Sequence, residues 1–265
     1  MKNYYFILCF VFSAVGTSIA QDLIFDNTFN SNASHNESPF AQDYYNADLG
    51  GLKQFNDSIF IYFRNDVNWN MQEVLSNVDA KTIHSNGSVT VENIFSQQTT
   101  YGNLGPDYYS VTDVVLSGTR VFVIQNEAYD YNGNTKFGIR VSSFDYVAGS
   151  FSPSTWGNAS FQPLENSRNA RGVMQGNDLL LVYNTDGGSA WQIGTTTASS
   201  TAGTISFSSN ILITINSAGT NSDIGEILLI SSSELYIVDN AYTYASNTYN
   251  DLTRVLKYNP LFYSL

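Results

Sequence analysis

Residues 117–124, SGTRVFVI, place a short polar turn directly before an alternating apolar run. The same form recurs at residues 56–63 (NDSIFIYF), 176–183 (GNDLLLVY) and 232–238 (SSELYIV). The first apolar residues are Ile59, Val121, Leu179 and Leu235, so the intervals are 62, 58 and 56 residues. In the last three cases an apolar run also precedes the turn, at residues 114–116, 172–174 and 227–230. This pattern predicts four repeated units, of which the last three each begin with a β-hairpin.

Further strands are expected after each hairpin. Residues 137–145 (FGIRVSSFD) are the clearest third strand, and residues 256–260 resemble its end. A fourth strand is expected at residues 88–95, 150–151 and 204–207. Helical periodicity is nearly absent, and only residues 70–78 could form a helical turn or two.

Units of three or four antiparallel strands repeated at a fixed period resemble the β-propeller superfamily, over residues 52–265. No specific family is indicated. The resemblance implies an all-β fold, a propeller-like ring of about four antiparallel sheets. A β-sandwich or a β-solenoid also consists of many short strands and remains the alternative.

The N-terminal region predicts secretion. Residues 1–20 combine Lys2, an apolar run at residues 4–12 and small residues before Gln21, which is the form of a signal peptide. Cys9 is the single cysteine and lies inside this segment, so the mature chain has no thiol. Residues 21–51 read as a polar leader, in which residues 21–25 could return to close the last sheet. Five glycosylation sequons begin at Asn32, Asn36, Asn56, Asn86 and Asn158.

Charge limits the range of partners. The chain of 265 residues carries 11 Lys and Arg against 23 Asp and Glu, a net charge of −12 at pH 7. A negative surface disfavours binding to nucleic acid or to anionic lipid. No segment after the signal approaches the 18 or so apolar residues of a membrane span.

One motif resembles an Asp-box, the hairpin of sialidase-type (BNR-like) propellers. Asp186, Gly188 and Trp191 match its pattern, whereas Asn184 replaces the usual Ser or Thr. The resemblance implies a structural role. A sialidase-like glycoside hydrolase would need three convergent arginines, an acid and a Tyr–Glu pair, and the arginines available are Arg64, Arg120, Arg140, Arg168, Arg171 and Arg254. Other propeller glycosidases place carboxylates around a central funnel, for which the chain offers Asp66, Asp113, Glu127 and Asp178. Arg120 and Arg140 occupy strand patterns, which predicts ordinary outward-facing charges.

Two other groups of residues could bind ligands. Asp130, Asn132 and Asn134 resemble the start of a calcium loop, although a plain hairpin turn explains them equally simply. Tyrosines beside Asn and Asp suit stacking on sugars or contact with proteins, and the candidates are Tyr108, Tyr109, Tyr129, Tyr131, Tyr242 and Tyr244. We therefore expect a secreted, non-enzymatic protein that recognises an extracellular glycan or protein. The alternatives are a propeller glycoside hydrolase and a self-associating matrix or filament subunit.

Overall fold

The structure is a computed structural model of the whole chain. It describes residues 46–68, 70–101, 109–131, 133–157, 159–164, 167–186, 191–208, 211–214, 220–245 and 248–258. The predicted signal peptide, residues 21–25, Asn32, Asn36, Tyr108, Asn132, Asn158 and Gly188 lie outside the described residues. Residues Asp43–Leu265 form one compact unit.

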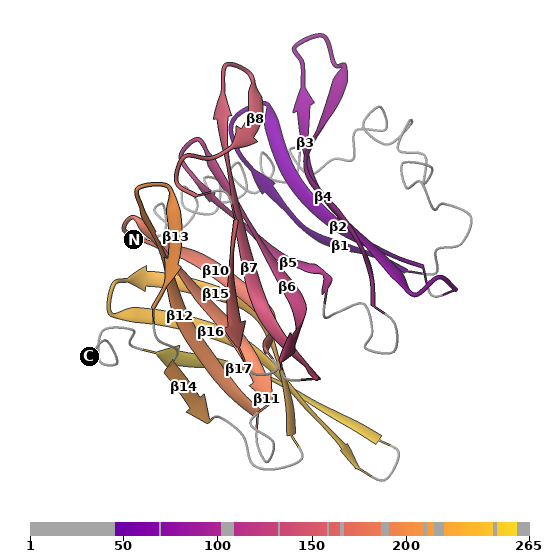
Figure 1. Cartoon of the computed structure of the whole chain (residues 1–265), viewed down its shortest axis with the longest axis vertical. Helices are drawn as coiled ribbons and strands as arrows, with labels where there is room; N and C mark the ends of the chain where they lie inside the picture. The colour runs from indigo at the N-terminus through magenta and orange to yellow at the C-terminus, as the bar shows by residue number, and fades with distance from the viewer. Residues whose placement is uncertain are drawn as a thin grey trace, which may run out of the picture. The chain divides into compact units, whose positions relative to one another are not determined.

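The described residues form four antiparallel sheets and no α-helix. Sheet 1 contains β1 (Asn46–Gln54), β2 (Ile59–Asn68), β3 (Glu73–Ile83) and β4 (Val89–Thr100). Sheet 2 contains β5 (Val111–Ser117), β6 (Arg120–Tyr131), β7 (Asn134–Val147) and β8 (Ser150–Pro153), with β9 (Ala159–Leu164) also paired to β7. Sheet 3 contains β10 (Ser167–Gln175), β11 (Asp178–Asp186), β12 (Trp191–Thr201) and β13 (Thr204–Phe207), with β14 (Ile211–Thr214) paired to β12. Sheet 4 contains β15 (Thr220–Ser231), β16 (Glu234–Ala245) and β17 (Thr248–Tyr258) (Figure 1).

The predicted all-β architecture of four antiparallel sheets is confirmed. The three predicted hairpins are β5–β6, β10–β11 and β15–β16. Gly118 and Gly176 adopt positive φ values of 59° and 64° in the first two turns, a conformation that glycine tolerates without strain. The predicted third and fourth strands are also present, within β4, β7, β8, β13 and β17.

Sheet 1 differs from the sequence predictions in three ways. Residues 70–78 are not helical, because residues 70–72 form a turn and β3 begins at Glu73. A first strand, β1, precedes the first repeat as well, although its Gly-rich sequence lacks an apolar run. The turn between β1 and β2 is longer than the two-residue turns of the other hairpins. Counted from the first apolar residue after the turn, equivalent positions in sheet 1 therefore lie one residue later than in the other sheets. Lys53 pairs with Ile61 where Val115 pairs with Phe122, and the equivalent of Val121 is therefore Phe60 rather than Ile59.

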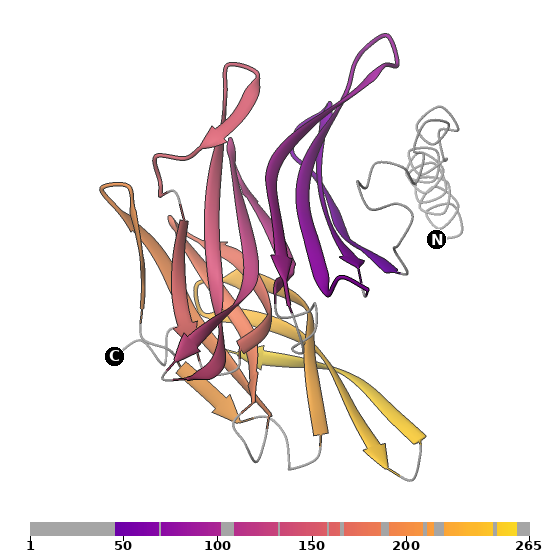
Figure 2. The same ribbon diagram turned by 45° about the vertical axis from the view of Figure 1, so that its right-hand side comes forward.

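The sheets pack face to face in chain order, and their first strands lie side by side: β1 contacts β5, β5 contacts β10, and β10 contacts β15 (Figure 2). This is the arrangement of propeller blades. We call the face that a sheet turns toward the next sheet its leading face, and the opposite one its trailing face. On β6, Phe122 and Ile124 belong to the leading face, whereas Val121 and Val123 belong to the trailing face.

Three apolar clusters fill the spaces between the sheets. Ile61 and Phe63 of sheet 1 meet Val121 and Val123 of sheet 2. The second cluster joins Phe122 and Ile124 to Leu179 and Leu181, and the third joins Leu180 and Val182 to Leu235 and Ile237. Each buried side chain of this size contributes about 1.5–3 kcal/mol. Sheets 2 and 3 therefore bury both faces within the chain, which explains their near-continuous apolar strands.

Candidate functional site

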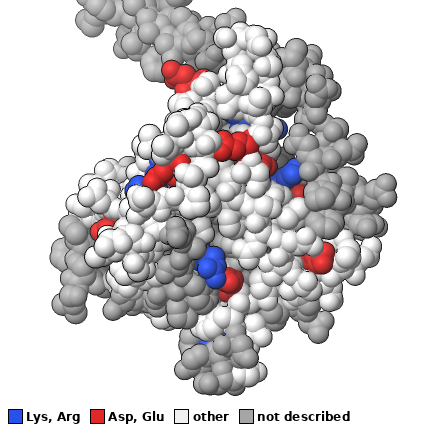
Figure 3. Space-filling view, turned by 45° about the horizontal axis from the view of Figure 1, so that its top comes forward, with Lys and Arg blue, Asp and Glu red and all other residues white. Residues whose placement is uncertain are grey.

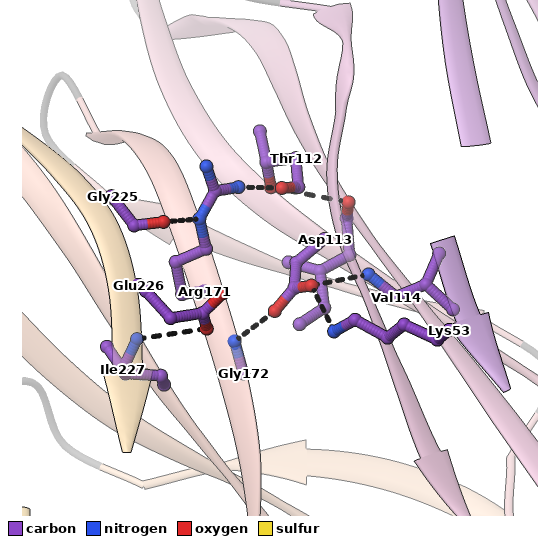
Figure 4. Close-up of polar contacts among 10 residues, drawn as sticks. Lys53, Thr112, Asp113, Val114, Arg171, Gly172, Gly225, Glu226 and Ile227 are labelled. Atoms are coloured by element: carbon purple, nitrogen blue, oxygen red, sulfur yellow. Dashed lines mark hydrogen bonds and ion pairs between the residues drawn. The ribbon is translucent and has the colours of Figure 1, made fainter. Parts of the chain in front are cut away.

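A network of polar contacts links the first strands of the four sheets, from sheet 1 to sheet 4 (Figure 4). Asp113 on β5 is its centre and is almost fully buried. Its Oδ1 accepts hydrogen bonds from Lys53 Nζ and Val114 N, both at 2.8 Å, and its Oδ2 accepts one from Gly172 N at 3.0 Å. The carboxylate therefore links β1, β5 and β10.

Arg171 on β10 extends this network of polar contacts toward sheet 4. Its guanidinium donates to the carbonyl of Gly225 on β15 at 3.0 Å and, in the other direction, to the carbonyl of Thr112 on β5. Glu226, next to Gly225, accepts a hydrogen bond from Ile227 N at 3.1 Å. Asp113, Arg171 and Glu226 occupy the same register position, because each follows a β-bulge and pairs with an equivalent residue of the second strand.

Buried asparagines provide a second kind of contact between the sheets. Asn65 on β2 donates to Val111 O at 2.8 Å and accepts from Val111 N at 3.0 Å, so its amide pairs with the backbone of the next sheet. Asn184 on β11 accepts from Ile224 N at 2.8 Å, and Ile224 is the register equivalent of Val111. Asn126 occupies the same place on β6 and is fully buried.

This geometry is suited to joining sheets rather than to acid–base chemistry. The Asp113 carboxylate is held by three donors, one of them a lysine, and each donor belongs to a first strand. The Arg171 donors are directed at main-chain carbonyls instead of at open space. Main-chain groups buried between sheets would be costly without partners, and these side chains supply the partners.

The carboxylates considered for a hydrolase lie apart along the sheets. Asp178 pairs with Gln175 at the first hairpin turn of sheet 3, whereas Asp66 and Glu127 lie toward the opposite ends of their strands. Glu127 forms a bidentate pair with Arg140, and Asp66 lies 3.4 Å from Arg64 Nε. Glu127 and Asp66 thus each have an arginine nearby on their own sheet.

The arginines are also divided among separate partners. Arg120 binds the Asp145 carboxylate through two hydrogen bonds of 2.7 and 3.1 Å, and Ser154 Oγ donates to the same carboxylate at 2.6 Å. Burial raises the pKa of Asp145, but the hydrogen bonds from Arg120 and Ser154 outweigh it, so that the pKa lies below its ordinary value of 3.8. Arg120 and Arg140 are consequently half-buried members of ion pairs, not the free outward charges that the strand pattern predicted.

The tyrosine candidates lie mostly near one end of the sheets. Because equivalent residues of neighbouring sheets bind each other, the described ends of the second strands and starts of the third strands lie at that same end of the sheets. Tyr129 and Tyr131 pair with Lys136 and Asn134 beside the β6–β7 turn. Tyr242 and Tyr244 occupy β16 close to the β16–β17 turn. Tyr109 is instead half-buried against the cluster of Val67, Val74 and Tyr101.

The remaining candidates are placed in turns. Asp186 pairs with Trp191 across the β11–β12 hairpin, and residues 187–190 lie outside the described part, so the Asp-box stays a prediction. Asp130 and Asn134 flank the β6–β7 turn, and the described residues contain no cluster of three or more His, Cys, Asp and Glu side chains suited to a metal. Asn56 and Asn86 are exposed, and each binds the backbone N–H of a nearby serine through Oδ1, at 2.9 Å from Ser58 and 3.0 Å from Ser88.

Charged side chains are sparse and scattered on the face drawn in Figure 3, where red and blue groups do not gather into one patch. Within the described ranges, no helix is long and apolar enough to cross a membrane.

No family model matches the chain, and no curated protein is significantly similar to it. Among solved structures, it is similar to an acylaminoacyl peptidase of Pyrococcus horikoshii, with a TM-score of 0.40 and 8% identity over 81% of this chain. The chain spans 34% of that peptidase. It is also similar to a GH43 endo-arabinanase from Bacillus licheniformis, with a TM-score of 0.39 and 11% identity over 78% of this chain and 71% of the other. An α-L-arabinofuranosidase of Fusarium graminearum follows, with a TM-score of 0.38 and 12% identity over 78% and 64%.

The strand order and the contacts between sheets define the class: an all-β protein of four antiparallel, propeller-like sheets. Function must be inferred from the chain's own residues.

Proposed function

We propose that this chain is a secreted, non-enzymatic recognition protein that binds an extracellular glycan or protein through the end of the sheets where the second strands turn into the third. This surface, which we call the recognition end, includes the β2–β3, β6–β7 and β16–β17 turns. One observation carries the proposal. The polar side chains described along the first strands form hydrogen bonds between neighbouring sheets, whereas two pairs of tyrosines lie beside turns at the recognition end.

The side chains of this end suit such a ligand. Met71 and Asn134 are exposed at the β2–β3 and β6–β7 turns, and Tyr129 and Lys136 are half-exposed cross-strand neighbours. A tyrosine ring stacks on a sugar face or an apolar protein surface, while asparagine and lysine supply hydrogen bonds at its rim. Secretion and glycosylation at the sequons remain part of the proposal.

The test is binding of the full chain to a glycan array and to immobilised extracellular-matrix proteins. Tyr129→Ala should weaken binding at least about tenfold, the loss of roughly 1.4 kcal/mol. Val147→Ala is the matched control, because Val147 is exposed at the β7–β8 turn, at the opposite end of the sheet. Equal binding by both variants would refute the assignment of the recognition end.

The glycoside hydrolase alternative is tested on the same material. Soluble sugar released from a polysaccharide panel, and lost on Glu127→Gln, would replace the recognition proposal with a catalytic one. Binding without release supports recognition.

A further inference from the structure

We infer that the leading face of sheet 4 binds the trailing face of sheet 1 in a second copy of this chain. The two faces are the only ones that the described residues do not pack against a neighbouring sheet. This goes beyond ligand recognition, and it assigns an interface to the self-association alternative.

Sheet 4 exposes apolar residues at positions that the preceding sheets bury. Leu228 is 58% exposed, whereas its register equivalent Val115 in sheet 2 is 7% exposed. Val255 is 63% exposed, whereas its equivalent Val141 is fully buried. Val238 is half-exposed at the position of the buried Ile124. An apolar surface in the pattern of an existing interface predicts a partner of the same kind.

The trailing face of sheet 1 shows the complementary exposure. Leu52 is 63% exposed, although its equivalents Val114 and Ile227 are 1% and 7% exposed. Phe60 and Tyr62 are partly exposed at the positions of the buried Val121 and Val123. In sheets 2, 3 and 4 these same positions receive the leading face of the preceding sheet.

The direction of packing selects this partner over others. Every interface within the chain joins a leading face to a trailing face, and the asparagine contacts run the same way, from Asn65 to Val111 and from Asn184 to Ile224. Asn240 occupies the equivalent register position in sheet 4. Among the described sheets of a second copy, sheet 1 alone has a trailing face that no other described sheet covers, so the contact is head to tail rather than symmetric.

The existing interface also predicts which residues meet. A methyl group added to Gly172 would lie 2.3 Å from Ile124 Cδ1 and 2.9 Å from Val115 Cγ2, so this position packs directly on the preceding sheet. Leu52 is the equivalent of Gly172, and Leu228 is the equivalent of Val115. Leu52 of one copy should therefore contact Leu228 of the other.

Polar groups support the same alignment. Glu226 occupies the position of Asp113, whose carboxylate accepts Gly172 N of the next sheet at 3.0 Å. It is exposed, so its free oxygen can accept Leu52 N of the second copy. Lys81, 4.8 Å from the centroid of the Tyr62 ring, adds a positive charge to the trailing face of sheet 1.

The experiment measures the mass of the full chain by sedimentation over a range of concentrations. The native chain should associate. Leu228→Asp or Leu52→Asp should raise the concentration at which half of the chains are associated at least about tenfold, because each variant places a charge in an apolar contact. Val147→Asp places the same charge on an exposed apolar residue outside both faces and should leave this concentration unchanged. A native chain that stays monomeric refutes the inference, and such a monomer could still bind the glycan array.

Cysteine pairs then identify the faces. Leu52→Cys and Leu228→Cys copies, each in a Cys9→Ser background and carrying different tags, should form a mixed disulfide when combined under oxidation. Predominant Leu228→Cys homodimers would instead show a symmetric contact of two sheet 4 faces and would overturn the head-to-tail assignment.

Discussion

Replacing Asn65 with alanine should destabilise the contact between sheets 1 and 2. The Asn65 amide exchanges two hydrogen bonds with the backbone of Val111, and its Oδ1 also accepts from Ser76 Oγ at 2.7 Å. Without it, Val111 O and the Ser76 hydroxyl lose their partner in a buried site. Val111 N keeps only the longer contact with Ser76 Oγ at 3.4 Å.

Each buried group left without a partner costs about 1–3 kcal/mol, so the expected loss is about 2–4 kcal/mol. For a domain of this size, that corresponds to a fall in Tm of about 5–15 °C. Asn65→Asp keeps the acceptor but removes the donor and brings a carboxylate oxygen toward Val111 O. It should therefore recover little of the lost stability.

Urea unfolding of the full chain, followed by intrinsic fluorescence, measures this effect. Asn86→Ala is the matched control, because Asn86 also accepts two hydrogen bonds, from Ser88 N and Ser88 Oγ, but is exposed. The control should lose less than about 1 kcal/mol. If both variants lost the same stability, asparagine would not be joining the sheets in the way described.

Three further perturbations test other contacts. Gly194→Ala should destabilise the chain by about 1–3 kcal/mol in urea unfolding, because its Cβ would lie 2.2 Å from Cζ of the buried Tyr183 ring; an unchanged midpoint would contradict this packing. The pKa of Asp145 is lowered in the folded state, so its ion pair with Arg120 stabilises the fold at pH values above the ordinary carboxyl pKa. This stability is lost as the pH falls through the lowered pKa. Asp145→Asn should therefore make the decline of Tm below about pH 4 less steep. Arg171→Met should cost about 2–4 kcal/mol by leaving two buried carbonyls without donors, and Arg171→Lys should restore less than half of it, as one ammonium cannot bind in both directions; full rescue by lysine would refute the bridging role.

The hairpins were predictable because their signals are local. A polar turn such as Gly118-Thr119 between two apolar runs specifies strand–turn–strand, and all three hairpins predicted in this way are present. β1 gave no such signal, since its glycines and Lys53 contribute little apolar periodicity. For the start of β3 the sequence also allows a helical turn or two, at residues 70–78, because the apolar residues there fit both the helical and the strand period. β3 is a strand because it pairs with β2 and β4 on its two edges.

The polar contacts between sheets were only partly visible in the sequence. Arg171 and Asp113 are isolated hydrolase candidates in the sequence, but their partners in neighbouring sheets lie 54 to 60 positions away. These partners are Thr112 and Gly225 for Arg171, and Lys53 and Gly172 for Asp113. The recurrence of Asn65, Asn126, Asn184 and Asn240 was available in the sequence, but the one-residue shift of the first unit concealed it. The signal that could have found it is a polar residue recurring at the repeat period after an apolar strand.

The sequence by itself determined three of the hairpins, several of the strands that follow them and the number of units, because backbone pairing within a hairpin depends on residues close in the chain. Only the tertiary structure decided which face of each sheet meets the next, and which polar groups hold them together. Those contacts join residues about one repeat apart, and their geometry depends on β-bulges whose position the alternation of apolar residues does not specify. The same distinction applies to the exposed Leu52 and Leu228: their apolar character is visible in the sequence, but only the packing order of the described sheets shows that no other described sheet covers them.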